Sequence, residues 1–190
     1  MQNPFTLEQL NENLSESGCE VNSVHCHLDR SGGHVISNDI TINENAGSAN
    51  VNCFQITGSV EIYRIYGAIK TATTLTNCTA AYFDLFPTGG SALDITKTGG
   101  VLSAMPVGTF FTKEALKGEI MTVIDPALGA VTEPTTTKKQ FTPFIVTKKT
   151  GADTHIRFNY TTSDAPASAV FTIYAEYRTP PNDGGTITAV

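Results

Sequence analysis

The chain has 190 residues, of which 40% are hydrophobic and 16% charged, and its formal net charge is −6. This length suits one substantial domain, and the basic residues form no stripe with interleaved aromatic side chains, which argues against a nucleic-acid partner. No segment approaches the ~20 apolar residues that span a bilayer and the first residues lack an export pattern, so we expect synthesis in the cytoplasm and no membrane partner.

The first 20 residues are predicted to form a short helix or an extended arm, followed by a single domain over residues 21–190. A capping-box pair and three leucines on one helical face indicate the helix: Thr6 and Gln9, with Leu7, Leu10 and Leu14. Because the segment is short and otherwise polar, it would be marginal alone. We therefore expect it to dock on its own domain or on a neighbour.

From residue 21 onward the sequence predicts short strands separated by turns rich in glycine, proline and polar residues. These strands are 24–28, 39–42, 51–56, 60–71, 77–85, 93–96, 101–105, 108–112, 119–124, 140–146, 154–161 and 169–180, with a last edge strand at 186–190. Their spacing indicates an all-β fold, an antiparallel β-sandwich that is jelly-roll-like. The long helical patterns of an α/β protein are absent from the sequence.

The strand predicted over residues 60–71 carries apolar side chains at both alternating phases. Val60 and Ile62 fall on one face, whereas Ile65 falls on the other. This pattern predicts a central strand covered on both sides. Gly67 inside the strand predicts either a bulge or a close approach of another backbone segment.

The region 154–180 shows the clearest alternation in the chain. Its two halves each place apolar side chains on one face: Ile156, Phe158 and Tyr160 in the first, and Phe171, Ile173, Ala175 and Tyr177 in the second. We interpret the two halves as an antiparallel pair with one dry face. The other face, which carries His155, Arg157, Asn159, Thr172, Glu176 and Arg178, combines polar groups without a converging acid, base or metal set.

A cluster of cysteine and histidine residues near the N-terminus is the best candidate for a metal site. Its members are Cys19, His25, Cys26, His27 and His34. His25 and His27 would share one face of a strand, and Cys19 and His34 could complete a tetrahedral zinc site. The alternative is an exposed strand face with one packed thiol, and the spacing matches no zinc-finger pattern. We assign no metal and no other cofactor, and we expect Cys26 and Cys53 to be packed free thiols.

Motifs for catalysis are missing from the sequence. It contains no nucleophile elbow and no phosphate-binding loop. The acids predicted to lie on strands could support glycoside hydrolysis as a pair: Glu61, Asp84, Glu119 and Glu176. The chain has no tryptophan to line a sugar groove. We therefore predict that the protein is not an enzyme and assign no catalytic, cofactor-binding or metal-binding residue.

Three segments resemble small β-sandwich structural proteins of tailed bacteriophages, which include head decoration (cement) proteins and other minor virion proteins. The segments are 54–71, 156–162 and 171–180, the last of which closes on Tyr-Arg-Thr-Pro. The resemblance covers roughly residues 51–190 and contains no catalytic motif. It implies a virion component without enzymatic activity, often a homotrimer, that clamps neighbouring subunits of the major capsid protein on the capsid surface.

Three hypotheses follow from these patterns. The first is a capsid decoration protein that bridges and stabilises capsid subunits. The second is a receptor-binding or carbohydrate-binding module of a tail or fibre, for which Tyr63, Tyr82 and Tyr174 are the candidate aromatic platform. The third is a sandwich enzyme. A decoration protein should remain on purified heads, whereas a tail module should fractionate with tails.

Overall fold

The computed structural model describes residues 33–43, 47–71, 78–113, 119–124, 143–162, 168–180 and 184–190. Within the unit His34–Val190, these residues form eleven strands and no helix. The predicted all-β fold is therefore confirmed. The predicted arm or helix and the predicted strand 24–28 lie outside the described residues.

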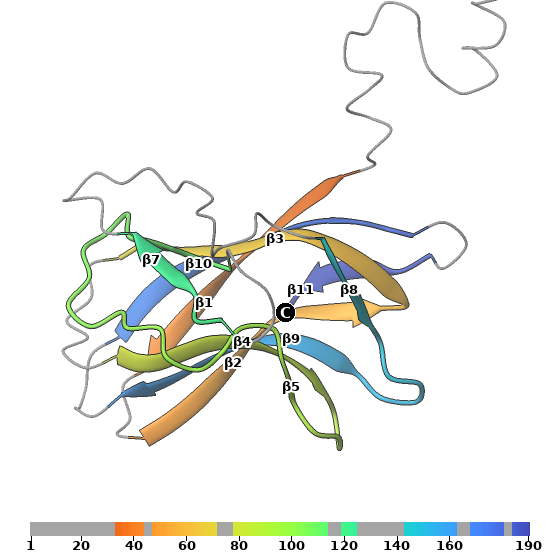
Figure 1. Ribbon diagram of the computed structural model, residues 1–190, viewed down its shortest axis with the longest axis horizontal. Helices are drawn as coiled ribbons and strands as arrows, with labels where there is room; N and C mark the ends of the chain where they lie inside the picture. The colour runs from red at the N-terminus through yellow and green to blue at the C-terminus, as the bar shows by residue number, and fades with distance from the viewer. Residues whose placement is uncertain are drawn as a thin grey trace, which may run out of the picture. The chain divides into compact units, whose positions relative to one another are not determined.

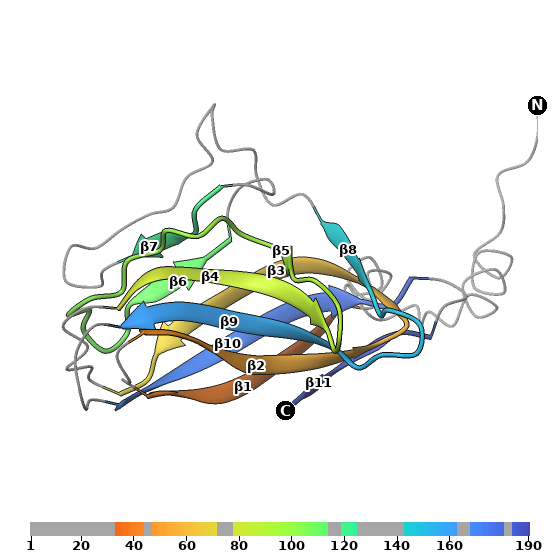
Figure 2. The same cartoon turned by 90° about the horizontal axis from the view of Figure 1, so that it is seen from below.

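The strands form two antiparallel sheets that pack face to face (Figures 1 and 2). Sheet A has the order β1-β10-β3-β6-β7, with β8 also paired to β3. Its strands are β1 (His34–Asn43), β3 (Ser59–Ile69), β6 (Phe110–Thr112), β7 (Thr122–Ile124), β8 (Phe144–Thr147) and β10 (Ser168–Arg178). Sheet B has the order β11-β2-β9-β4-β5. Its strands are β2 (Gly47–Thr57), β4 (Cys78–Pro87), β5 (Leu93–Asp94), β9 (Thr154–Thr162) and β11 (Thr186–Ala189).

The strand order is that of a jelly roll. Eight of the strands, β1 to β5 followed by β8, β9 and β10, can be numbered one to eight in chain order. With these numbers, the order β1-β10-β3-β8 in sheet A becomes 1-8-3-6, and the order β2-β9-β4-β5 in sheet B becomes 2-7-4-5. This arrangement of two interlocked Greek keys defines the jelly roll. Strands β8 and β6 share the same flank of β3, pairing with Ser59–Ile62 and with Tyr66–Ala68 respectively, while β11 extends sheet B beyond β2.

The predicted pairing of the two halves of region 154–180 is wrong. Strand β9 lies between β2 and β4 in sheet B, whereas β10 lies between β1 and β3 in sheet A (Figure 2). The assignment of faces is nevertheless correct, because Ile156, Phe158, Phe171 and Ile173 are all fully buried between the sheets. Alternation identifies which face of a strand is buried, but it does not identify the strand's neighbours.

Four phenylalanines form the centre of the core between the two sheets. The ring centroid of Phe158 lies 5.4 Å from those of Phe83 and Phe111 and 5.9 Å from that of Phe171. Gly67 makes room for this cluster, since a Cβ at that position would lie 2.3 Å from Cζ of Phe111. The contact at Gly67 is therefore made by side chains, whereas the sequence predicts a bulge or a close backbone approach there.

A bulge at Tyr63 corrects the prediction that β3 is covered on both faces. Ile62 pairs with Tyr177 and Arg64 pairs with Glu176, which leaves Tyr63 as the extra residue. Such a bulge shifts the alternation by one residue. The apolar residues before and after it, Val60, Ile62, Ile65 and Ile69, are therefore all buried on the inner face.

The prediction of a strand over residues 101–105 is also wrong, because its backbone makes isolated hydrogen bonds instead of the regular series that pairs two strands. The amide of Leu102 donates to the carbonyl of Cys78 at 2.8 Å, and Ala104 has a φ of 55°. The neighbouring predictions 93–96 and 108–112 shorten to β5 and β6. Cys53 is a buried thiol as predicted, whereas Cys26 lies outside the described residues.

Candidate functional site: the outer faces of the two sheets

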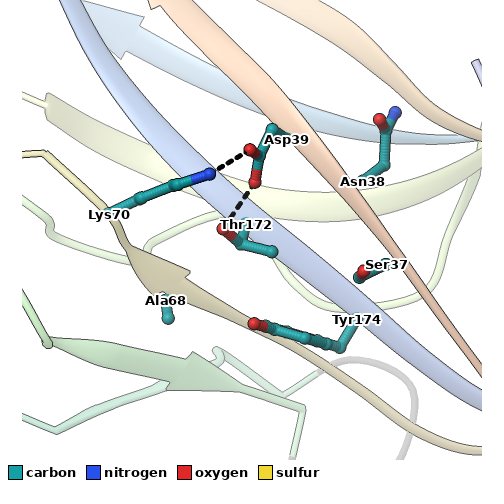
Figure 3. Close-up of a pocket in the computed structure, with 7 residues that line it drawn as sticks. All are labelled: Ser37, Asn38, Asp39, Ala68, Lys70, Thr172 and Tyr174. Carbon is teal, nitrogen blue, oxygen red and sulfur yellow. Dashed lines mark hydrogen bonds and ion pairs between the residues drawn. The ribbon is translucent and has the colours of Figure 1, made fainter.

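Each sheet turns one face away from the core, and each of these outer faces carries a hollow. The hollow on sheet A has a volume of about 590 Å³ (Figure 3). Its lining residues are Ser37, Asn38, Asp39, Ala68, Lys70, Thr172 and Tyr174. The groove on sheet B has a volume of about 400 Å³ and is lined by residues of β2, β4 and β9 together with Thr98.

Asp39 on β1 is the centre of the hydrogen-bond network in the hollow of sheet A. Its carboxylate accepts a hydrogen bond from Nζ of Lys70 and another, of 2.6 Å, from Oγ1 of Thr172 (Figure 3). These two bonds, from Lys70 first and Thr172 second, hold the pKa of Asp39 below its usual value. The carboxylate is therefore ionised, and its charge is matched by a neighbouring ammonium group.

Two tyrosines stack beside this network. Tyr66 and Tyr174 lie directly opposite each other on β3 and β10, with ring centroids 4.9 Å apart and planes 12° apart. Burial raises the pKa of Tyr66, and the nearby Glu176 carboxylate raises it further. Both partners of the stack thus present an apolar ring, and Tyr66 keeps a neutral phenol.

The remaining charges on this face of sheet A are also paired across strands. Glu61 accepts a hydrogen bond from Nε of Arg178, and Nη1 of Arg64 lies 4.0 Å from a carboxylate oxygen of Glu176. The guanidinium group of Arg178 lies 5.5 Å from the ring centroid of Tyr63. These contacts match cations with anions, so this face has neutralised charges rather than a free acid or base.

The outer face of sheet B contains a buried ion pair. Arg157 on β9 lies directly opposite Asp84 on β4. Its Nε and Nη2 donate to the two carboxylate oxygens of Asp84 at 2.9 and 2.7 Å, and the guanidinium carbon lies 3.8 Å from the ring centroid of Phe86. Such bidentate pairs are strong and geometrically specific. Asp84 is completely buried, so the pair belongs to the interior of this face.

Next to this pair, Asn50, Asn159 and Tyr82 form a row across three adjacent strands. Asn159 is only 7% exposed, and its Nδ2 has no hydrogen-bond partner among the described residues. Burial raises the pKa of Tyr82, and the carboxylates of Asp84 and Asp94 raise it further. This row combines two neutral amides with a neutral phenol.

The structure describes one member of the predicted metal cluster. His34 begins β1, and its ring centroid lies 5.3 Å from that of Tyr177. Cys19, His25, Cys26 and His27 lie outside the described residues. Within the described ranges, no group of three or more His, Cys, Asp or Glu side chains could hold a metal ion. The zinc hypothesis and its alternative therefore remain untested.

The four acids predicted on strands do not come together. Glu61 and Glu176 lie on sheet A beside arginines, Asp84 is buried in sheet B, and Glu119 is exposed in the segment before β7. The candidate tyrosines are also divided. Tyr63 and Tyr174 are on strands of sheet A, whereas Tyr82 is on sheet B.

Sequence reasoning missed Tyr66 as the stacking partner of Tyr174 and Asn50 as the neighbour of Asn159. It placed Arg157 and Asn159 on a polar face but assigned them no site. The partners of these residues lie on strands that are distant in the sequence. Asp84 and Arg157, for example, are 73 residues apart. Such a separation leaves no local pattern in the sequence.

The chain was compared with known proteins, and no family model, curated protein or solved structure matches it. Within the part of the chain that the structure describes, there is no helix with the length and apolar character needed to cross a membrane.

Proposed function

We propose that the protein is a structural component of a virus particle, most simply a capsid decoration protein of a tailed bacteriophage that binds the major capsid protein. The jelly roll supports this proposal because the fold recurs in viral capsid domains. It also recurs in lectins and cupins, so fold alone does not select a function. The feature of this molecule that carries the proposal is the edge strand β1.

Strand β1 offers an unusually regular edge for another chain. All ten of its residues, His34 to Asn43, pair in unbroken register with β10. No strand pairs with its other side within the described ranges. It contains no lysine, proline or bulge, three of the devices that block edge-to-edge pairing, and its carboxylate, Asp39, is ion-paired with Lys70. A free edge of this kind can bind an extended segment of a partner through main-chain hydrogen bonds.

The protein also holds this edge in place. Nδ2 of Asn38 donates to the carbonyl of Cys53 at 2.9 Å and to the carbonyl of Val190 at 2.6 Å. These bonds link β1 to the opposite sheet and to the last residue of the chain. Because an ordered edge loses little conformational freedom on binding, it suits attachment to a capsid subunit.

A pair of matched lysine substitutions tests this role of β1. Val35 at the start of β1 and Ile145 on β8 are 67% and 64% exposed, and they lie on different edge strands of sheet A. Val35→Lys should block edge pairing by placing a charge there, and Ile145→Lys should not. Particles lacking the protein would be incubated with each variant, and bound protein would be quantified after sedimentation.

The expected result is loss of capsid binding for Val35→Lys and retention for Ile145→Lys. If both variants bind as the unchanged protein does, β1 is not the attachment edge. Fractionation of the unchanged protein with tails and not with heads would contradict the decoration role itself.

The predicted arm and the predicted trimer belong to the same proposal. Deleting residues 1–20 should weaken capsid attachment while leaving the melting temperature of the β-sandwich unchanged. Sedimentation equilibrium of the full chain should give the mass of a homotrimer. A deletion variant that attaches as tightly as the full chain would remove the arm from the proposal, and a monomer would remove the trimer.

A further inference from the structure

The groove on the outer face of sheet B has the dimensions and the lining of a ligand site. Its volume of about 400 Å³ falls within the range of ~300–1,000 Å³ typical of small-molecule sites. Its lining residues are Ser48, Ala49, Asn50, Ala80, Tyr82, Thr98, Arg157, Asn159, Tyr160 and Thr161. Most of these side chains carry a hydroxyl, amide or guanidinium group, so the groove offers several hydrogen-bonding positions.

The amide of Asn159 is the strongest indication that this groove receives a hydrogen-bonding ligand. The residue is 7% exposed, and its Nδ2 has no partner among the residues that the structure describes. Leaving a buried donor unsatisfied costs roughly 1–3 kcal/mol, and native proteins contain few such groups. Because Asn159 lines the groove, a ligand oxygen there would supply an acceptor once the amide turns towards it.

The electrostatics of the groove favour an uncharged ligand. Arg157 is the cation in the lining, and its bidentate bond to the buried Asp84 already matches its charge. Burial raises the pKa of Tyr82, so its phenol stays neutral. The remaining polar groups are amides and hydroxyls. A phosphate, sulfate or carboxylate would find no unmatched cation among these residues.

A bulge in β4 shapes one wall of the groove. Thr79 pairs with Thr161 and Tyr82 pairs with Asn159, so two alanines of β4 oppose one residue of β9. Ala80 has a φ of 54°. A bulge of this kind changes the direction of the side chains that follow it. The small alanine opens space beside Tyr82, whose ring offers an apolar surface next to the polar amides.

We propose that this groove binds a neutral glycan. A sugar ring carries hydroxyl groups that can accept from the amide of Asn159 and exchange hydrogen bonds with Asn50 and Thr98, and its C–H face can pack on the ring of Tyr82. The site lies on sheet B, whereas capsid attachment is proposed at the β1 edge of sheet A. The two proposals therefore fail or succeed separately.

Binding would be measured with an array of immobilised neutral oligosaccharides containing glucose, galactose, mannose and N-acetylhexosamines, with sialylated and sulfated glycans as charged counterparts. The array would be probed with the full chain, and hits would be confirmed by titration calorimetry. We expect binding to at least one neutral oligosaccharide that does not depend on added salt, because counter-ions do not screen an uncharged ligand.

Two substitutions test the residues that carry the argument. Asn159→Asp keeps the shape but removes the amide donor, and Tyr82→Ala removes the ring; each should weaken binding by about tenfold or more. The controls are Asn52→Ala, an exposed asparagine of β2 that does not line the groove, and Tyr174→Ala on sheet A. These controls should change affinity less than about twofold.

Circular dichroism would verify the fold of each variant, and if Asn159→Asp fails to fold, Tyr82→Ala decides. The proposal is overturned if no neutral glycan binds or if only sialylated or sulfated glycans bind. It is equally overturned if the folded groove variants bind as tightly as the controls.

Discussion

The outer faces of the two sheets place their charges in opposite ways. On sheet A the paired side chains are partly hydrated, with exposures of 56% and 45% for Lys70 and Asp39. On sheet B the corresponding figures are 12% for Arg157 and 0% for Asp84. Both faces neutralise their charges, but only sheet B does so away from water.

Water can take the place of either partner in the exposed pair on sheet A. It cannot do so in the buried pair on sheet B. Surface pairs contribute little because water and salt screen them. A buried pair depends on its partner, since an uncompensated charge in the interior is costly. Asn159, whose Nδ2 has no hydrogen-bond partner among the described residues, lines the same groove as Arg157. The stability of the outer face of sheet B therefore depends more strongly on its polar partners than that of sheet A.

The largest expected effect comes from Arg157→Met, which leaves the buried carboxylate of Asp84 without its cation. Removal of one member of a buried pair costs about 3–5 kcal/mol, and urea unfolding followed by circular dichroism would measure the loss. The matched change on sheet A is Arg64→Met, whose pair with Glu176 is 55% and 33% exposed. That change should cost at most ~1 kcal/mol.

The double variant Asp84→Leu, Arg157→Met tests the cause. Replacing a buried ion pair with apolar side chains is often neutral, so the double variant should recover much of the stability lost by Arg157→Met alone. Equal losses for Arg157→Met and Arg64→Met would contradict the distinction between the two faces.

The next largest effect concerns the inner face of sheet A, where Gly67→Ala should destabilise the sandwich. The added Cβ would lie 2.3 Å from Cζ of Phe111 and 2.8 Å from Cδ1 of Ile173. Overpacking of this kind costs about 1–3 kcal/mol. The neighbouring Ala68→Ser, on the partly exposed outer face, should change the unfolding free energy by less than ~0.5 kcal/mol. If the two changes cost the same, the packing at Gly67 is looser than described.

The fold class and the buried faces could be predicted from the sequence because both depend on local patterns. The alternation in β9 and β10 identified Ile156, Phe158, Phe171 and Ile173 as core residues, and all are buried. Their partners could not be predicted in this way. The chain crosses from sheet B to sheet A between β9 and β10, so these two strands lie on opposite sides of the core instead of pairing.

The bulges and the site are the other features that local patterns do not specify. Tyr63 and Ala80 each add one residue to a strand. The position of each bulge depends on how the partner strand packs. The bond between Asp84 and Arg157 joins strands 73 residues apart. The sequence could show that Arg157 and Asn159 share a polar face. It could not show that Arg157 is ion-paired or that Nδ2 of Asn159 has no partner among the described residues.

A smaller effect is expected from the aromatic stack on sheet A. Tyr174→Leu keeps an apolar side chain but removes the ring that stacks on Tyr66 at 4.9 Å. Aromatic pairs contribute about 0.5–1.5 kcal/mol beyond their buried area. A double-mutant cycle with Tyr66→Leu would measure the coupling free energy from urea unfolding. Simple additivity of the two single changes would show that the rings do not interact.

The smallest expected effect is the pH dependence contributed by Asp39. The bonds from Lys70 and Thr172 lower its folded-state pKa below the ordinary value of 3.8. A group with a lowered pKa stabilises the fold above its unfolded pKa and loses this contribution as the pH falls through the folded value. Asp39→Asn should therefore lower the melting temperature slightly at about pH 6, and the difference should vanish towards about pH 2.

A substitution of Thr172 separates the contributions of its hydroxyl and of Lys70 to this pH dependence. Thr172→Val removes the second of the two bonds to Asp39 but leaves the bond from Lys70, so it should retain most of the acid-dependent difference. Melting curves of the three proteins between about pH 2 and 6 would test the order. Coincident curves for the unchanged protein and Asp39→Asn would show that the pair on sheet A contributes nothing to stability. The contrast with the buried pair on sheet B would then be complete, because water would fully replace the one and not the other.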